Sequence, residues 1–210
     1  MKFSIVLFIC VVLSSSALRA DPVSIYSNFG AGDTYSSISG LSVSQAVAVP
    51  FVAPGTGVPG FAYALSDITL AAYTSDTGAN PATVALYEDS AGLPGTALES
   101  LDATLGTDPA SALVTVDSLI HPVLESGARY WIVLSDPLSF DVTWNANLTG
   151  AVDVASLSDA GWADLGDSYS QGAVEVDAGL VPDVPEPGTL LALGSGLSAL
   201  MVLARRRVRK

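Results

Sequence analysis

The chain of 210 residues has one cysteine, Cys10, and one histidine, His121. A lone cysteine forms no intramolecular disulfide, and because Cys10 lies in an apolar N-terminal run, the rest of the chain cannot build a thiolate metal site. A single histidine excludes the histidine clusters that bind zinc or copper. We therefore expect a fold stabilised by its hydrophobic core and no bound cofactor, with calcium the one metal left to consider.

Basic residues are also scarce outside the two ends of the chain. Between Asp21 and Glu186 the only basic residue is Arg129, whereas all 21 acidic residues lie in this span, which gives it a formal charge of −20. Such a charge repels the phosphates of nucleic acids and anionic lipid headgroups. We therefore exclude nucleic acid as a partner.

Residues 1–20 have the layout of a secretory signal peptide. Lys2 precedes the apolar run Phe3–Leu13, and small residues follow up to Ala17. Cleavage after Ala17 and cleavage after Ala20 both stay open. The apolar run is shorter than a bilayer span requires, which disfavours a retained N-terminal anchor. We predict a signal helix and export of the chain.

The C-terminal end resembles a membrane span followed by a basic cap. Thr189–Ala204 contains 16 uncharged residues, which as a helix would span about 24 Å of a hydrocarbon core about 30 Å thick. Arg205, Arg206 and Arg207 keep this end cytoplasmic by the positive-inside rule, which places the acidic body outside. We predict a transmembrane helix over 189–204 and a cytoplasmic end over 205–210. A helix in the protein core is the alternative, but it leaves the basic end unexplained.

The segment before this helix carries a recognisable motif. Val184-Pro185-Glu186-Pro187-Gly188, with the apolar helix and Arg-rich end behind it, resembles the PEP-CTERM protein-sorting signal of Gram-negative bacteria. The resemblance implies that Pro185, Glu186 and Pro187 are recognised by an exosortase, a membrane-embedded enzyme similar to cysteine transpeptidases. It also implies an inner-membrane-anchored precursor, removal of the tail, and transfer of the body to the cell surface or an exopolysaccharide matrix.

Period-two patterns indicate strands throughout the body, and we find no convincing amphipathic helix. In "LSFDVTW", Leu138, Phe140, Val142 and Trp144 alternate with polar residues, as in a half-buried strand. The stretch "RYWIVL" (129–134) is apolar on both faces, as in a central strand. Further strands are predicted at 45–52, 64–73, 83–88, 113–119, 151–155 and 173–176. Pro50 marks the first of these as an edge or bulged strand.

Turn-rich segments such as "APGTGVPG", "SDTGANPA", "EDSAGLPG" and "LGTDPAS" separate the strands. This pattern predicts an all-β protein, with an antiparallel β-sandwich or jelly-roll-like single domain over 21–178. Prolines within 179–188 predict a linker. The order of "SNFGAGDTYSSISG", "YALSDITLAAYT", "VALYEDSAGLPGTALES" and "LESGARYWIVLS" resembles the choice-of-anchor R domain of bacterial exported proteins. That resemblance implies an extracellular sandwich and transfers no catalytic motif.

Calcium binding stays open because hard cations bind oxygen ligands in loops. The candidate loops contain Asn28 and Asp33, Asp76 and Asn80, and Glu88 and Asp89. None has the EF-hand spacing, so ordinary turns are the alternative. We interpret the glycosylation sequon at Asn147 as coincidental.

The three tryptophans differ in their surroundings. Trp131 and Trp144 lie in strong strand patterns and are predicted core residues. Trp162, with Asp164 and Tyr169 nearby, is expected to be more exposed. It is the candidate sugar contact, because an aromatic ring can stack on a pyranose. Hydrophobic packing of a loop is the alternative.

Catalytic signals are weak. His121 precedes Pro122 at a strand end, and no nucleophile-elbow sequence accompanies it. No spacing among the carboxylates singles out a glycosidase pair. We therefore predict an exported, non-enzymatic surface or matrix protein with a structural or interaction role in exopolysaccharide or biofilm. A carbohydrate-binding module is the alternative, and a glycosidase is less favoured.

Overall fold

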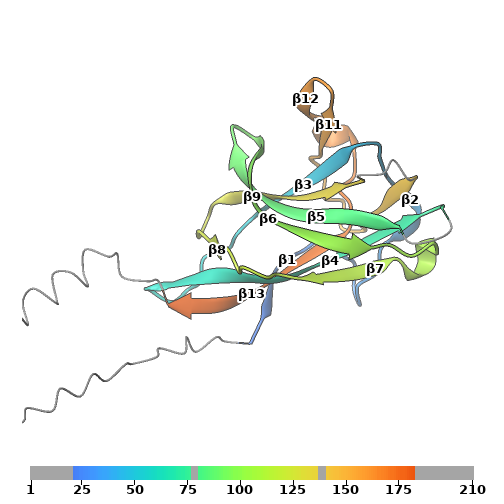
Figure 1. Cartoon of the computed structure of the whole chain (residues 1–210). Helices are drawn as coiled ribbons and strands as arrows, with labels where there is room; N and C mark the ends of the chain where they lie inside the picture. The colour runs from blue at the N-terminus through green and yellow to red at the C-terminus, as the bar shows by residue number, and fades with distance from the viewer. Residues whose placement is uncertain (1–20, 77–79, 137–140, 183–210) are drawn as a thin grey trace, which may run out of the picture.

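The structure, a computed structural model of the chain, describes residues 21–76, 80–136 and 141–182 (Figure 1). Every strand pair among them is antiparallel, and their helical content is two 3₁₀ turns, η1 (Pro109–Ser111) and η2 (Gly166–Ser168). The prediction of an all-β fold is confirmed. The signal helix and the transmembrane helix predicted for 1–20 and 189–204 lie outside the described residues.

A seven-stranded sheet is built around one long strand. Its order is β1 (Val23–Ser27), β13 (Val174–Pro182), β4 (Phe61–Thr74), β10 (Val142–Ala146) and β2 (Ser36–Val43), while β7 (Leu113–Asp117) and β8 (Val123–Leu124) also pair with β4. The 14 residues of β4 therefore hold four neighbouring strands in place.

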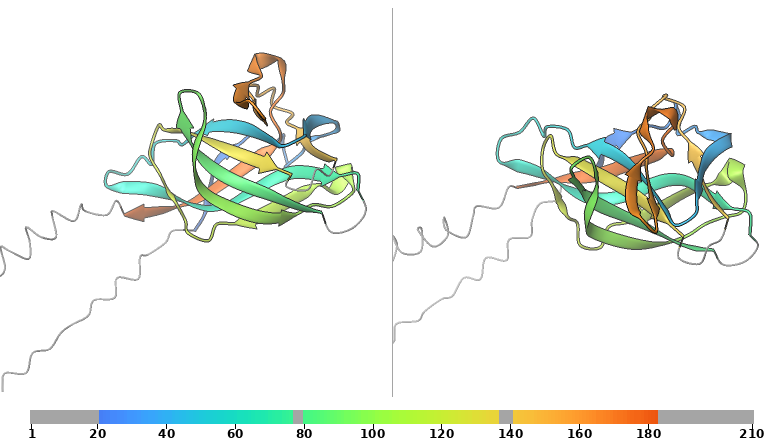
Figure 2. Two further views of the ribbon diagram at one scale, coloured as in Figure 1. Left: turned by 45° about the horizontal axis from the view of Figure 1, so that its top comes forward. Right: turned by 90° about the horizontal axis from the view of Figure 1, so that it is seen from above.

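The second sheet has six strands. Its order is β12 (Gly161–Asp164), β11 (Ala155–Ser158), β3 (Ala46–Val52), β9 (Arg129–Ser135), β5 (Pro81–Ser90) and β6 (Leu93–Thr104). The chain crosses between the sheets repeatedly, for example from β2 to β3, from β3 to β4 and from β4 to β5. Crossings of this kind are typical of sandwich and jelly-roll connections, and Figure 2 shows the two curled layers from two sides.

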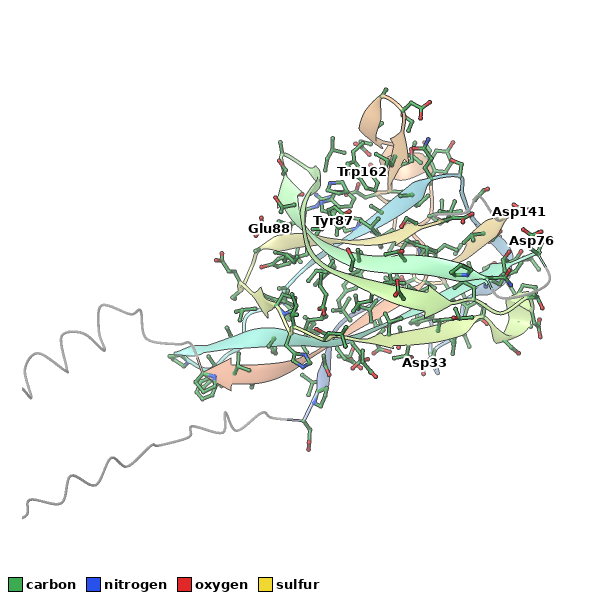
Figure 3. The ribbon with its side chains drawn as sticks, in the orientation of Figure 1. Asp33, Asp76, Tyr87, Glu88, Asp141 and Trp162 are labelled. Atoms are coloured by element: carbon green, nitrogen blue, oxygen red, sulfur yellow. The ribbon has the colours of Figure 1, made fainter. Side chains whose placement is uncertain are left out.

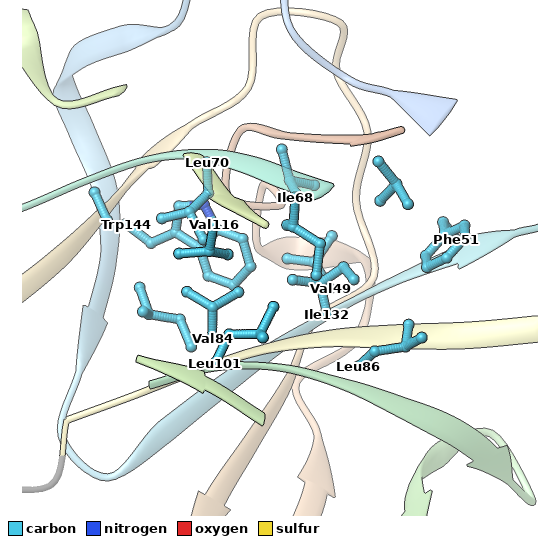
Figure 4. Packing of buried hydrophobic residues seen from close by; sticks show 14 of the residues in the cluster. Val49, Phe51, Ile68, Leu70, Val84, Leu86, Leu101, Val116, Ile132 and Trp144 are labelled. Carbon is cyan, nitrogen blue, oxygen red and sulfur yellow. The ribbon is translucent and has the colours of Figure 1, made fainter. Parts of the chain in front are cut away.

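The main core lies between the sheets and draws on both (Figure 4). Ile68 and Leu70 of β4 point into it from one sheet, and Val84 and Ile132 from the other. Each is at most 1% exposed, and burial of such a side chain contributes about 1.5–3 kcal/mol. With no disulfide possible, this core is the main source of stability.

Several predicted strands are confirmed in place. β9 is buried on both faces between β3 and β5, as expected for 129–134, and Val142 and Trp144 of β10 face the core. The strands predicted at 45–52, 64–73, 83–88, 113–119 and 173–176 correspond to β3, β4, β5, β7 and β13. Pro50 lies in the part of β3 that pairs with β9 alone, because β11 pairs only with Ala46–Ala48. The strand is therefore a local edge at Pro50, as predicted.

The strand predicted at 151–155 is wrong. Val152 makes an isolated bridge to Ser170, and β11 begins only at Ala155. Asp153 has a positive φ of 85°, which interrupts an extended strand. The backbone groups of Ala151 and Val152 instead form hydrogen bonds with the side chains of Asn147 and Gln171.

Other strands were missed because their sequences are rich in turn-forming residues. β2 contains four serines and a glycine, and β6 starts within the segment "EDSAGLPG" that was interpreted as a turn. β13 continues to Pro182, four residues into the predicted linker, because it pairs with β4 as far as Phe61. The folded domain therefore extends beyond residue 178.

Candidate functional site

The sorting residues Pro185, Glu186 and Pro187 and the basic residues Arg205, Arg206 and Arg207 lie outside the described residues. The described chain ends at Pro182, which pairs with Phe61. The last strand of the domain thus ends three positions before Pro185, so the predicted recognition motif follows the sheet almost directly in the sequence.

A second hydrophobic cluster lies on the outer face of the six-stranded sheet. It consists of Ala46, Ala48, Ala85, Trp131, Val133 and Ala155, with Tyr87, Leu93, Leu157 and Trp162 packed against it. Trp131 is 0% exposed although it points away from the main core. We call these ten residues the outer cluster.

The β11–β12 hairpin covers the outer cluster. Trp162 of β12 contacts Tyr87 of β5 edge to face, with ring centroids 6.4 Å apart, although three strands separate β12 from β5 within the sheet. The hairpin must therefore fold back over the sheet. Figure 1 shows it rising on the same side as the turn between β5 and β6, and Figure 3 shows Trp162 and Tyr87 between the two.

Arg129 joins the outer cluster through ionic contacts. Its guanidinium carbon lies 4.7 Å from the Trp131 ring centroid. Its nitrogens lie 2.6 Å from Asp153 and 3.5 Å from Asp89, and the Trp131 indole N–H also donates to Asp89 at 2.8 Å. This network orients the one basic side chain of residues 21–182 toward the protein itself.

Trp162, the candidate sugar contact, is half-buried. The structure brings it together with Tyr87, which sequence spacing could not indicate. Of its predicted companions, Asp164 accepts a hydrogen bond from the Gly166 amide, and Tyr169 is 49% exposed after η2. The ring of Trp162 therefore packs against the outer cluster and keeps part of its surface accessible.

The candidate calcium loops are built by turn hydrogen bonds. Among the described residues, no group of three or more acidic, histidine or cysteine side chains is arranged to hold a metal ion. Asn80 is buried and donates to the Asp76 carbonyl. Asp89 accepts from the Gly92 amide as well as from Trp131. Asp33 and Glu88 are exposed, in different parts of the molecule (Figure 3).

Asn28, the remaining calcium candidate, belongs to a buried amide network. Its side-chain amide donates to Gln171 and to the Gly172 carbonyl, and its oxygen accepts from the Val174 amide. These bonds use both side-chain atoms of Asn28 inside the fold and connect it to the start of β13. Asn147 of the sequon is 6% exposed and donates to the Ala151 and Gln171 carbonyls. Its amide nitrogen is thus used inside the fold.

A row of acidic side chains crosses the outer face of the seven-stranded sheet. Asp67 of β4 lies directly opposite Asp117 of β7 on one side and Asp177 of β13 on the other. Glu175 lies two residues before Asp177, on the same face. Like charges in directly opposed positions repel. We call these four residues the acidic row. The alternation of residues along each strand indicates which side chains point outward, but the strand register decides that these four lie side by side.

The acidic row perturbs one of its members. Burial raises the pKa of Asp177, and the charges of Asp67 and Glu175 and a hydrogen bond with Asp67 raise it further, to about 6. The Asp177 carboxyl group is therefore largely protonated under mildly acidic conditions.

Glu99 of β6 is a buried carboxylate that organises the loop after β7. It accepts hydrogen bonds from the Ser118 hydroxyl at 2.6 Å and from the Leu119 and Ile120 amides at 2.6 and 2.9 Å. Desolvation raises the pKa of Glu99, but these bonds and the nearby His121 outweigh it and lower the pKa below its usual value. His121 lies in the loop before β8, and its Nδ1 lies 2.9 Å from the Leu65 carbonyl oxygen.

A cleft of about 520 Å³ lies between the loop before β2 and η1. It is lined by Asp33, Thr34, Tyr35, Ser37, Ala110, Ser111 and Leu113. The Tyr35 hydroxyl accepts from the Ala112 amide and holds the two segments together. A single carboxylate and several hydroxyls line this cleft, which sequence reasoning missed because its walls lie over 70 positions apart.

No helix in the described parts of the chain has the length and apolarity needed to span a membrane. The PEP-CTERM protein-sorting motif matches residues 183–209, the segment that follows the last described strand. This match supports the resemblance of the tail. No curated protein and no solved structure matches the chain. The sorting motif indicates an exported, membrane-anchored precursor of a Gram-negative bacterium, processed by an exosortase.

Proposed function

We propose that exosortase processing releases this acidic β-sandwich from the membrane to the cell surface or the exopolysaccharide matrix, where it has a structural or interaction role without catalysis. The observation that carries the proposal is the sorting motif at 183–209, placed directly after a domain that closes at Pro182. A compact domain that ends beside its processing segment can be handed over intact when the tail is removed.

The body is consistent with this role in its chemistry. Its one arginine is engaged by Asp89 and Asp153, and its core carries no cysteine that oxidation could alter. An acidic surface keeps such a protein soluble outside the cell. We also propose that the body is a choice-of-anchor R type domain, on the order of the four sequence segments quoted above.

The sorting step is tested by replacing Pro185, Glu186 and Pro187 with alanine in the native host. We expect export to continue while the tail stays attached, so that intact-mass measurement finds Arg205–Lys210 in the mature protein. The matched control is Pro182→Ala, an exposed proline immediately before the matched segment 183–209, which leaves the motif intact. Normal trimming of the triple variant would contradict the proposed processing.

A second candidate function is carbohydrate binding by the outer cluster. It is favoured by one observation, the contact between Trp162 and Tyr87 on an outer face between two hairpins. Two aromatic rings of this kind can contact the apolar face of a sugar. Since Arg129 is already paired, neutral sugars suit the site better than acidic ones.

A glycan array of neutral oligosaccharides tests this second candidate. We expect Trp162→Ala to lose any binding that the wild-type chain shows, whereas Tyr169→Ala, an exposed aromatic outside the outer cluster, keeps it. An empty array, or equal binding by both variants, would count against the carbohydrate function. Neither result would affect the proposed sorting.

A further inference from the structure

The chain leaves the domain through a two-stranded extension of the seven-stranded sheet. Phe61–Ala64 of β4 pair there with Gly179–Pro182 of β13, and β8 pairs with Tyr63 and Ala64. Figure 1 shows β4 and β13 extending side by side to the end of β13, where the described chain ends. We call residues 53–64, 123–124 and 179–182 the exit arm.

The exit arm carries no charged residue, although the span 21–186 has a formal charge of −20. Its exposed side chains are apolar instead. Val58, Phe61 and Val123 are 44%, 41% and 55% exposed. Val123 pairs with Ala64, three residues from Phe61, so Phe61 and Val123 lie on opposite faces of the sheet and the exit is flanked by exposed apolar side chains on both faces. Exposed apolar side chains around a chain exit indicate a surface that contacts something other than water.

The opposite end of β4 is acidic. Asp76 follows the end of β4, Asp108 precedes η1, and Asp141 accepts a hydrogen bond from Ser75. β4 has 14 residues, so this end lies about 44 Å from Phe61 at the rise of an extended strand. Charge is therefore unevenly distributed along β4: the exit arm itself has none, the acidic row begins three residues after it at Asp67, and the far end of the strand is acidic again.

The tether to the membrane is short. Seven residue steps separate Pro182 from Thr189, where the apolar stretch of the tail begins, and they reach at most about 24 Å when fully extended. In the anchored precursor the exit arm must therefore lie close to the bilayer. The acidic end of β4 can then point away from the bilayer.

We propose that the exit arm of the precursor contacts the lipid surface, with Val58, Phe61 and Val123 entering the headgroup region. The inference rests on the membrane anchoring that the sorting motif indicates, and it adds the orientation of the domain. Apolar and aromatic side chains gain free energy at the boundary of headgroups and acyl chains, whereas anionic lipids repel the aspartates of the other end. Processing then begins from a domain whose exit strand already lies on the membrane.

Site-specific labelling tests this orientation in the full chain. Cys10→Ser removes the only cysteine, so that Phe61→Cys or Ile38→Cys carries a single nitrobenzoxadiazole label. Ile38 is the matched control because it is 97% exposed on β2, in the half of the sheet away from the exit arm. The protein is reconstituted in phosphatidylethanolamine–phosphatidylglycerol vesicles that contain a headgroup-nitroxide lipid. We expect quenching at position 61 to exceed that at position 38 at least twofold; equal quenching in vesicle-bound protein would overturn the inference.

A second variant separates lipid contact from proximity alone. With the label at Val58→Cys, Phe61→Asp should abolish most of the quenching, whereas Ile38→Asp should leave it unchanged. Both substitutions replace exposed side chains, so circular dichroism should show the same fold. Unchanged quenching in the Phe61→Asp variant would overturn the proposal. Protein that floats with the vesicles without quenching contradicts the orientation alone, while protein that fails to float contradicts the anchoring as well.

Discussion

Replacing Asp177 with asparagine should stabilise the domain near neutral pH. Asp177 lies opposite Asp67 and beside Glu175, and its folded-state pKa of about 6 exceeds the value of 3.8 for a free aspartate. At pH 7 the folded state must therefore ionise a carboxyl group whose surroundings favour the protonated form. Asparagine has the same shape and carries no charge, so it removes this cost.

The magnitude follows from the size of the pKa shift. A shift of this size would correspond to roughly 3 kcal/mol if it were fully expressed in stability. Because the side chain is only partly buried, solvent screening reduces the expected gain to about 1 kcal/mol. For a domain of this length that gain raises the melting temperature by roughly 2–4 °C.

The upward direction of the pKa shift at Asp177 also predicts how the stability of the domain depends on pH. Between pH 3.8 and about 6 the folded state binds more protons at Asp177 than the unfolded state does, so this carboxyl makes stability fall as the pH rises through that window. The gain from Asp177→Asn should therefore be present at pH 7.5 and nearly absent at pH 4. Thermal unfolding followed by circular dichroism at both pH values measures it.

Two comparisons make the result decisive. Asp102→Asn on β6, an exposed aspartate opposite Thr83, should change stability by less than about 0.5 kcal/mol. The double variant with Asp67→Asn should gain less than the sum of the two single variants, because both remove the same repulsion. A lower melting temperature for Asp177→Asn at pH 7.5, or an equal gain at pH 4, would refute the reasoning.

The other predictions concern buried contacts. Glu99→Gln should destabilise the domain by about 1.5–3 kcal/mol above pH 5, because it weakens charge-assisted bonds to the loop after β7. Because the folded-state pKa of Glu99 is lowered, this stabilisation is complete above the unfolded-state pKa of about 4.3 and is lost as the pH falls through the folded-state pKa. Urea titrations of the wild-type chain and the Glu99→Gln variant at pH 7 and pH 3 measure the loss. An equal loss of stability at both pH values would contradict this prediction. Gly172→Ala should cost about 1–3 kcal/mol, since a Cβ there would overlap the buried ring of Trp144. Gly106→Ala, where a Cβ meets nothing within 4 Å, is the control, and similar melting temperatures for the two variants would argue against this packing.

The acidic row and the outer cluster show where sequence reasoning stops. Alternation indicates that Asp67, Asp117 and Asp177 face outward on their own strands. Only the register of β7, β4 and β13 places the three side by side, and that register depends on packing between residues up to 110 positions apart. Likewise, Trp162 and Tyr87 meet because a hairpin folds over the sheet, and no local pattern specifies that fold.

Local residue patterns by themselves determined the all-β class, the central position of β9, the burial of Trp131 and Trp144, and the sorting motif after the domain. Each depends on a few neighbouring residues, because strand alternation and short motifs are local properties. The tertiary structure decided that Asn28 serves a buried amide network, that β13 extends to Pro182, and that the charge-free exit arm lies opposite an acidic end. Those features depend on which strands pair and in what register, and pairing is settled by burial of the whole core.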